Sequence, residues 1–304
     1  MNKTFTHKKR ANPANAFLKM KWLKHRHTIS SGQKFLTGYH LLEQSKWPVY
    51  VSLAACSIAM GLVMVMHQKL VVVGFMLVGL GLGALAKSVQ SWFEEFNMEK
   101  WKRQHSSMTV RGVKVGMALF IMSEAAFFAS FFWAFSHACW GSCSMNMVWP
   151  PMGFRCISPW KWPMYNCALL IGSGLTVTYA HKAAKWQERS PYVHEERVHK
   201  ALNITCLLGG FFMLIQGYEY WSMPFSMNDS VYGSCFFMMT GFHGLHVIAG
   251  SVWLCCCSQA ASNKAYMMRR PHLGVQLGVW YWHFVDVVWL MVWGVVYVNG
   301  SVWY

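Results

Sequence analysis

The sequence predicts an all-α membrane protein that crosses the bilayer seven times, and three observations support this fold class. Hydrophobic residues make up 55% of the 304-residue chain, charged residues only 12%, and the mean hydropathy is +0.25. A soluble domain carries about twice that charged fraction. The apolar residues form seven long runs, and 24 of the 27 Lys and Arg residues fall in alternate gaps between them. A nucleic-acid-binding protein can have the same net charge of +16, but only a bilayer explains this alternation.

The first two apolar runs predict an antiparallel helical hairpin. Val49–Met66 is followed by His67, Gln68 and Lys69, and the second run, Leu70–Ala86, starts at once. Long apolar runs are expected to be helical, because in lipid only a helix or a closed barrel satisfies every backbone polar group. The second run is rich in glycine, which allows close approach to a neighbouring helix.

Five further runs predict five more helices. The first of these five, which is the third run of the chain, is long enough to tilt in the bilayer. Prolines at 150, 151, 159, 163 and 224 fall in the gaps, where helices are expected to stop. The expected helices, in chain order, are Val113–Trp140, Met164–Tyr179, Ala201–Trp221, Tyr232–Cys257 and Leu277–Val298.

The cation distribution also predicts the orientation. Positive residues collect in loops that are not translocated, so the N-terminus is expected inside and the C-terminus outside. Trp and Tyr residues near the ends of the runs, such as Trp47, Trp140 and Trp221, match the aromatic belts of membrane interfaces. A model with six or eight spans would break the charge alternation.

Three segments are expected along the chain. Residues 1–38 form a basic, histidine-containing extension without acidic residues, which is typical of an inner-side tail and resembles an organellar import sequence. Residues 39–98 contain the first two helices, and residues 99–304 contain helices three to seven.

Glu124, in the middle of the third run, is the strongest candidate for chemistry. Burial in hydrocarbon disfavours a charged carboxylate, so ionisable residues within spans are functional candidates. One hypothesis is a carboxyl that exchanges a proton, and the other is a carboxylic acid that hydrogen-bonds a neighbouring helix. Both remain open from the residues alone.

His283 and Asp286 lie three residues apart on the seventh helix and therefore share one face. A structural pair that ties this helix to its neighbours is favoured over catalysis. Glu219, near the end of the fifth run, is a third intramembrane polar residue and is also expected to be structural.

His243 and His246 share a face of the sixth helix, which raises the alternative of a haem held by two histidines, with His137 as the partner of His246. Hydrogen bonds between helices or to lipid headgroups are favoured, because histidine alone is an unspecific signal. Cys139 and Cys143 have a spacing that occurs in copper or zinc sites, but too few further ligands follow to predict a metal. Most of the ten cysteines lie within apolar runs and are expected to be small packing residues.

A series of motifs resembles subunit III of the haem–copper cytochrome c oxidases from about Tyr39 to Val298. The matching blocks, in the order of the family, are Ser123-Glu124, Phe131 to Phe135, Trp149-Pro150-Pro151, Ser173-Gly174, Ala180-His181, Glu219-Tyr220, Pro224-Phe225, Tyr232-Gly233-Ser234, Gly241 to Ile248 and Trp280 to Leu290.

The resemblance implies a V-shaped bundle, with helices 1–2 set against helices 3–7 and phospholipids in the cleft. It implies no metal and no catalytic residue in this chain, because haem a and copper lie in partner subunits that reduce oxygen and pump protons. Glu124 matches the intramembrane glutamate of the family, which faces subunit I. The chain is thus expected to support proton uptake and to stabilise the complex.

The family also implies partners, lipids and a location. Subunit I is the main expected partner, followed by subunit II and accessory subunits, and phospholipids with cardiolipin among the candidates; no nucleic acid is expected. The location is the mitochondrial inner membrane, with the N-terminus in the matrix and the C-terminus in the intermembrane space. The best matches to lipid-binding positions of the family are Trp92, His105, Trp133, His243 and His246.

The chain departs from the family pattern at the end of the second helix. Ser91-Trp92-Phe93-Glu94 replaces a common Trp-Trp-Arg-Asp, so the arginine that would meet a lipid phosphate is missing. The alternatives to this function are subunit III of a quinol oxidase, which usually lacks the first helix pair, and, from other classes, a haem-bearing cytochrome or a proton-coupled transporter.

Overall fold

The computed structural model describes residues 44–68, 70–101, 105–141, 149, 156–187, 195–261 and 273–301, all within the unit His40–Tyr304. The described residues form helices and connecting turns without any β-strand, which confirms the all-α class. The basic extension expected at residues 1–38 lies outside the described residues, so its role stays a prediction.

The predicted hairpin is confirmed as α2, Trp47–Met66, packed along α3, Val71–Trp101. Glycines allow the two backbones to approach closely, because a Cβ atom on Gly61 would lie only 2.7 Å from the carbonyl oxygen of Gly74. Ser57 strengthens the contact by donating a 3.1 Å hydrogen bond to the carbonyl of Leu77. The turn between the helices is tight enough to place Gln68 and Leu70 in the left-handed region, with φ of 54° and 51°.

Helix α3 is longer than the sequence predicted. The apolar run ends at Ala86, but the helix continues to Trp101 through a segment that contains Gln90, Glu94 and Glu95. Hydropathy marks the part of a helix that suits lipid, whereas the helix itself continues as long as its residues tolerate helical geometry. The segment boundary set at Met98 therefore falls inside the last turn of α3.

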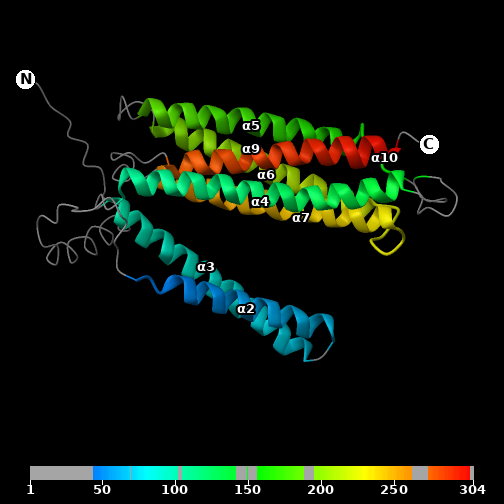
Figure 1. Cartoon of the computed structure of the whole chain (residues 1–304), viewed down its shortest axis with the longest axis horizontal. Helices are drawn as coiled ribbons and strands as arrows, with labels where there is room; N and C mark the ends of the chain where they lie inside the picture. The colour runs from blue at the N-terminus through cyan, green and yellow to red at the C-terminus, as the bar shows by residue number, and fades with distance from the viewer. Residues whose placement is uncertain are drawn as a thin grey trace, which may run out of the picture. The chain divides into compact units, whose positions relative to one another are not determined.

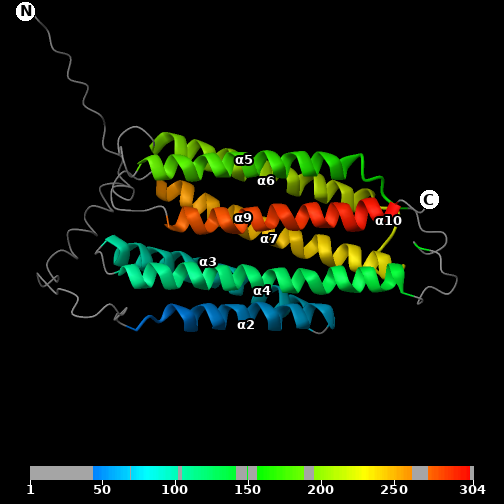
Figure 2. The ribbon, with the colours of Figure 1, turned by 45° about the horizontal axis from the view of Figure 1, so that its top comes forward.

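Five long helices form a bundle, and Figures 1 and 2 both show them running side by side. Helix α4 begins after Ser106, whose hydroxyl caps it by accepting a 3.2 Å hydrogen bond from the amide of Thr109. The helices of the bundle are α4 (Ser107–Trp140), α5 (Trp162–Gln187), α6 (Glu195–Ser222), α7 (Val231–Ala261) and α9 (Leu273–Val292), the last continuing through the π-helical turn η2 (Trp293–Val298) into α10 (Asn299–Ser301).

Helix α9 lies at the centre of this bundle, in contact with α4, α5 and α7. Two of its three tryptophans, Trp282 and Trp289, are the largest fully buried side chains of the described residues. The core is therefore aromatic, and small residues on neighbouring helices make room for it: a Cβ atom on Gly209 or Gly250 would lie within 3.0 Å of the Trp282 ring.

Six of the seven long helices are apolar and long enough to cross a membrane, and α5 falls below that level of hydropathy. Polar residues of α5 explain the difference, because they pair with neighbouring helices within the bundle. Asn166 pairs with Gln216, Thr176 with Thr205, and Thr178 with His283. A seventh span at α5 stays a prediction, as does the V-shaped arrangement of hairpin and bundle.

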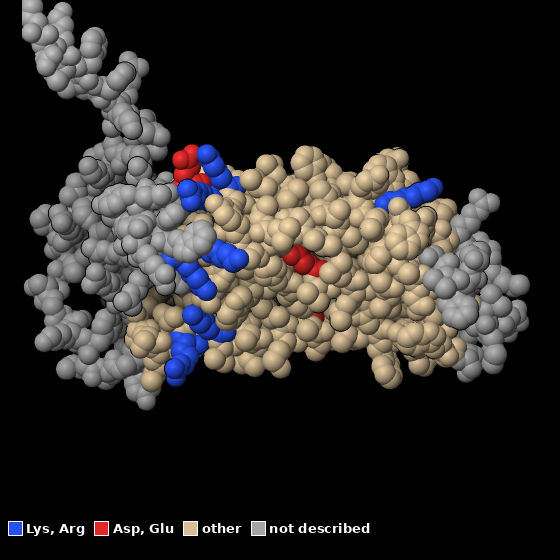
Figure 3. All heavy atoms as spheres, turned by 90° about the horizontal axis from the view of Figure 1, so that it is seen from above, with Lys and Arg blue, Asp and Glu red and all other residues tan. Residues whose placement is uncertain are grey.

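The predicted alternation of the cations stays a prediction, because many of them lie outside the described residues. Figure 3 shows that most of the Lys and Arg atoms in view lie near one end, although blue atoms also occur near the other end and red acidic atoms in the middle. This distribution is the one expected when a single end of a helical bundle remains on the non-translocated side.

Candidate functional site

The side chains of Glu124 on α4 and His246 on α7 meet at the contact between these two helices. The Oε2 atom of Glu124 lies 2.9 Å from Nε2 of His246, although the residues are 122 positions apart in the chain. The ring of Phe128 covers the histidine edge-on, at a centroid distance of 5.1 Å. The whole Glu124 side chain is 23% exposed.

The second nitrogen of His246 determines what this pair can do. Nδ1 lies 2.6 Å from the carbonyl oxygen of Phe242, which can only accept, so Nδ1 carries a proton. Nε2 and the Glu124 carboxyl must then share one further proton between them. The pair is neutral overall whether that proton resides on the carboxyl or on the ring, so it can be held in an apolar environment and can still exchange a proton.

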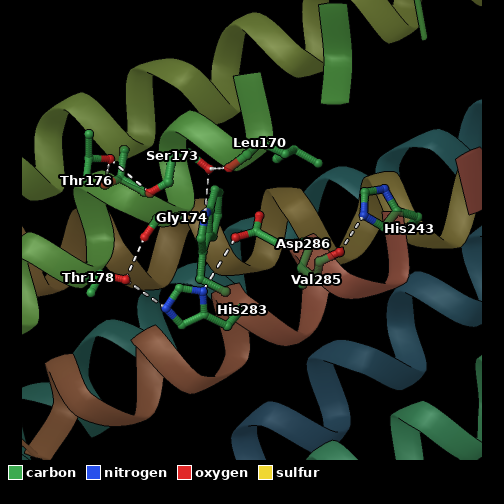
Figure 4. A network of polar contacts seen from close by, with 11 residues as sticks. Leu170, Ser173, Gly174, Thr176, Thr178, His243, His283, Val285 and Asp286 are labelled. Carbon is green, nitrogen blue, oxygen red and sulfur yellow. Dashed lines mark hydrogen bonds and ion pairs between the residues drawn. The ribbon is translucent and has the colours of Figure 1, made fainter. Parts of the chain in front are cut away.

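A second polar network joins α5 to α9, as Figure 4 shows. The Thr178 hydroxyl donates to the carbonyl of Gly174 at 2.7 Å and therefore accepts from Nε2 of His283 at 3.1 Å. On the other side of the ring, Nδ1 lies 3.7 Å from Oδ2 of Asp286. This distance suits an ion pair and is too long for a hydrogen bond.

The same network explains why α5 has a glycine at position 174. A Cβ atom there would lie 2.7 Å from Oδ2 of Asp286, so only glycine allows the carboxyl to lie against α5. One turn away, the indole of Trp282 donates to the Ser173 hydroxyl at 2.9 Å. His283 and Asp286 therefore contribute to the contact between α5 and α9, which is the arrangement expected of a structural pair.

His243 occupies a different environment from His246. It is fully buried, its ring packs edge-on against Phe212 and near Trp289, and its Nε2 donates a 3.1 Å hydrogen bond to the carbonyl of Val285. A lipid headgroup does not reach this position within the described fold, so His243 is a poor fit to the lipid role that the resemblance implied.

Among the other candidate lipid positions, the two tryptophans are accessible, whereas the side chains of His105 and His246 are only 11% and 13% exposed. The side chains of Trp92 and Trp133 are 41% and 75% exposed, on α3 and α4 respectively. His105 precedes α4 and lies 3.3 Å from the carboxyl of Glu99, with its ring 4.9 Å from that of Phe96. These positions are compatible with contacts to lipid, which stay a prediction.

The arrangement of the histidines argues against a haem. Both ring nitrogens of His246 are already engaged, and His137 lies 13 residues beyond Glu124 on α4, or about 20 Å along the helix axis. Two axial ligands must lie at the same depth, and these two do not. Among the described residues, no group of three or more His, Cys, Asp or Glu side chains is placed to hold a metal ion. Cys143 of the Cys-x3-Cys motif lies outside the described residues.

Sequence reasoning missed several partners of these residues. Thr178 carries no signal in the sequence, because a threonine in a helix is common and only its distance from His283 gives it a role. Tyr220 and Thr240, which join α6 to α7 through a 2.6 Å hydrogen bond between their hydroxyls, were missed for the same reason.

Comparisons with known proteins point to a single family. A family model described as "Cytochrome c oxidase subunit III" matches residues 37–301. The chain is 39% identical over 272 residues to the cytochrome c oxidase subunit 3 of Branchiostoma lanceolatum, covering 88% of this chain and 100% of the relative. It is also 37% and 38% identical over 265 residues to the subunits 3 of Sus scrofa and Rattus norvegicus, covering 86% of this chain and 97% of each relative.

Proposed function

The chain belongs to the cytochrome c oxidase subunit III family, and we propose that, as a multi-pass mitochondrial membrane subunit of this oxidase, it takes up and returns a proton at the pair Glu124–His246. The redox chemistry of oxygen reduction takes place in partner subunits, with their haem a and copper. This chain stabilises the complex and supports its proton uptake. The hairpin α2–α3 favours a cytochrome c oxidase over a quinol oxidase, whose third subunit usually lacks it.

The single observation that carries the proposal is the 2.9 Å contact between Glu124 and His246. A proton-exchanging group within a span needs a partner that stabilises both of its protonation states. His246 can do this because its Nδ1 proton is held by the carbonyl of Phe242, which leaves Nε2 free to share a proton with Glu124. The Glu124 side chain is 23% exposed, so this chain alone does not enclose the pair completely.

Replacing Glu124 by glutamine tests this role. The amide of glutamine donates to Nε2 of His246, so the contact between α4 and α7 and the volume at the site are preserved while the exchangeable proton is lost. We expect a normal amount of assembled oxidase with its full haem content, together with a severalfold slower proton uptake or a severalfold shorter turnover lifetime. Stopped-flow pH measurements and progress curves of oxygen consumption give these quantities.

The matched control is Glu196→Gln, which removes an exposed carboxyl that pairs with Lys200 on the surface of α6. This variant is expected to behave like the unmodified oxidase. Loss of assembly in Glu124→Gln would assign the residue to helix packing and refute the exchange role. Glu124→Ala is the harsher comparison, because it also removes packing volume.

The proposed main partner is subunit I, and the surface of α4 supports this assignment. On the side of α4 that points away from Glu124, the apolar side chains Leu119 and Met122 are 59% and 66% exposed. Such a face is suited to another membrane helix, because helices in lipid associate through van der Waals packing. Contacts with subunit II and with accessory subunits belong to the same proposal and rest on the family alone.

Bound phospholipids are proposed at the exposed tryptophans. Trp92 and Trp133 present an apolar ring with one N–H donor, a combination that suits the boundary between acyl chains and headgroups. The phosphate of such a lipid would need a cation, and Arg103, Lys264 and Arg269 are candidates from the sequence that lie outside the described residues. Cardiolipin is one candidate among these lipids.

The proposed orientation predicts where the two termini lie. With seven spans in the inner membrane, an epitope placed before residue 1 should be protected in intact mitoplasts, because it faces the matrix. An epitope after Tyr304 should be accessible to antibody or protease there, because it faces the intermembrane space. Accessibility of both epitopes from the same side would contradict the odd number of spans and the charge-based orientation.

A further inference from the structure

A second group of polar side chains lies deep in the bundle, in a different part from the Glu124–His246 pair. Asn166 comes from α5, Gln216 and Glu219 come from α6, and Tyr297 comes from the π-helical turn η2. These side chains are at most 4% exposed. The oxidase role proposed above makes no use of them, and the structural role expected of Glu219 does not explain why its carboxyl lies here.

The members of this group are neighbours without being fully bonded to one another. Asn166 donates a 3.2 Å hydrogen bond to Gln216. The hydroxyl of Tyr297 lies next to both the Glu219 carboxyl and the Gln216 amide. Even so, both oxygens of Glu219, the Tyr297 hydroxyl, Oδ1 of Asn166 and Nε2 of Gln216 have no partner in hydrogen-bonding geometry among the described residues.

Buried polar atoms that are neighbours without a direct hydrogen bond are typical of groups bridged by water. Each group here has unused capacity: the carboxyl accepts on both oxygens, the amide of Gln216 donates, and the tyrosine hydroxyl can do both. If the oxygen and nitrogen atoms of both amides are exchanged, the number of amide atoms without a partner stays the same. One N–H₂ donor and one carbonyl acceptor still lack a partner. The requirement for a bridging molecule therefore does not depend on those assignments.

The backbone of η2 contributes to the same arrangement. A π-helical turn is wider than an α-helical one and is rare, and it occurs often at functional sites. In η2 it places Tyr297 towards α6 and leaves the carbonyl of Val296 accessible to the hydroxyl of Tyr232 on α7, which donates to it at 3.2 Å. The irregular turn is thus held in position by a neighbouring helix, which fixes one wall of the polar group.

We propose that this group is an internal hydration site, in which ordered water bridges Glu219 to Tyr297, Gln216 and Asn166. Water is the ligand that satisfies donors and acceptors together, and it removes the penalty of leaving a carboxyl unpaired in the bundle interior. A monovalent or divalent cation fits the site less well, because in either assignment of the amides an N–H₂ group lines it and would repel a positive ion.

The position of Glu219 provides the source of the water. Glu219 lies three residues before the end of α6 at Ser222, and the loop that follows is exposed at Ser226 and Asp229. The aqueous phase on that side is the nearest source of water, and on this proposal the Glu219 carboxyl exchanges its proton with it.

A high-resolution density map of the intact oxidase tests the proposal directly. We expect at least one ordered peak within hydrogen-bonding distance, about 2.7–3.2 Å, of at least two of the four side chains, with Glu219 among them. A dry site, with Glu219 bonded directly to Tyr297, would overturn the proposal. So would a peak surrounded by oxygen atoms alone at the shorter distances of a bound cation.

Infrared spectroscopy of the purified oxidase provides the second measurement. The difference between the unmodified enzyme and Glu219→Gln isolates the carboxyl signal, which should shift on transfer to D₂O. A Glu219 signal that keeps its position after equilibration in D₂O would refute access of water, whatever the effect of Glu124→Gln on proton uptake. If Glu219→Gln does not assemble, the density of the unmodified oxidase still decides.

A milder pair of variants localises the bridging water. Tyr297→Phe removes only the hydroxyl and should eliminate or displace the peak nearest to η2. Tyr218→Phe removes an exposed hydroxyl from the same helix as Glu219 and should leave every peak in place. An unchanged peak in Tyr297→Phe would contradict the bridging role of the tyrosine.

Discussion

Replacing Trp282 by alanine is expected to produce a large loss of stability in this chain. The side chain is fully buried at the centre of the bundle, and its ring fills the space that Gly209 and Gly250 leave open. Deleting a buried tryptophan costs about 3–5 kcal/mol in soluble proteins. We expect about 3 kcal/mol here, because a lipid-solvated reference state removes part of the transfer term while the cavity and the lost contacts remain. The free energy of unfolding in mixed micelles measures the effect. The fraction of the subunit retained in the assembled complex is a second measurement.

Two further variants separate packing from the hydrogen bond of Trp282. Trp282→Phe keeps most of the volume and loses the 2.9 Å bond from the indole to the Ser173 hydroxyl, so it should cost only about 1 kcal/mol. Trp221→Ala removes a tryptophan that is 91% exposed and should leave the stability of the bundle nearly unchanged. If the exposed and the buried alanine variants lost stability equally, α9 would not be the centre of the core.

The positions of the helices could be predicted from the sequence because hydropathy reports the contact with lipid directly. The run Val49–Met66 corresponds to α2 within two residues at its start. The method fails where a helix continues past its apolar run, as in the second half of α3, since Glu94 and Glu95 look like loop residues by composition alone. The π-helical turn η2 could also not be predicted from the sequence, because no residue type specifies an extra residue in one turn of an otherwise regular helix.

The candidate site was predictable residue by residue but not as a pair. Glu124 and His246 were each singled out because a polar group in hydrocarbon is costly. Their partnership depends on the relative rotation and depth of α4 and α7, which no local pattern encodes. His243 illustrates the limit, since it lies one turn from His246 on the same helix and bonds to α9 at Val285. The two histidines on one face of α7 therefore have different roles, because different neighbouring helices pack against them.

Replacing Gly61 by leucine should separate α2 from α3. A Cβ atom at this position would lie 2.7 Å from the carbonyl oxygen of Gly74 and 2.9 Å from the amide nitrogen of Val78. Both are backbone atoms of a helix, so the clash cannot be relieved by turning a side chain. Overpacking a tight contact costs about 1–3 kcal/mol, and the larger leucine places this variant at the upper end of that range. Hydrogen–deuterium exchange of the amides in α2 and α3 should accelerate accordingly, while the exchange of α7 stays unchanged.

Gly79 of α3 supplies the matched control, because a Cβ atom there meets nothing within 4 Å. Gly79→Leu adds the same side chain to the same hairpin on an open side, and glycine is a poor helix former, so this variant should be neutral or slightly stabilising. Comparing the two variants separates the effect of the close backbone contact at Gly61 from the effect of adding a leucine side chain. If both leucine variants accelerated exchange equally, the added side chain itself would be responsible, and the hairpin would not depend on close contact at Gly61. If neither did, lipid would be able to solvate the separated helices at no cost, and the small residues of this hairpin would need another explanation.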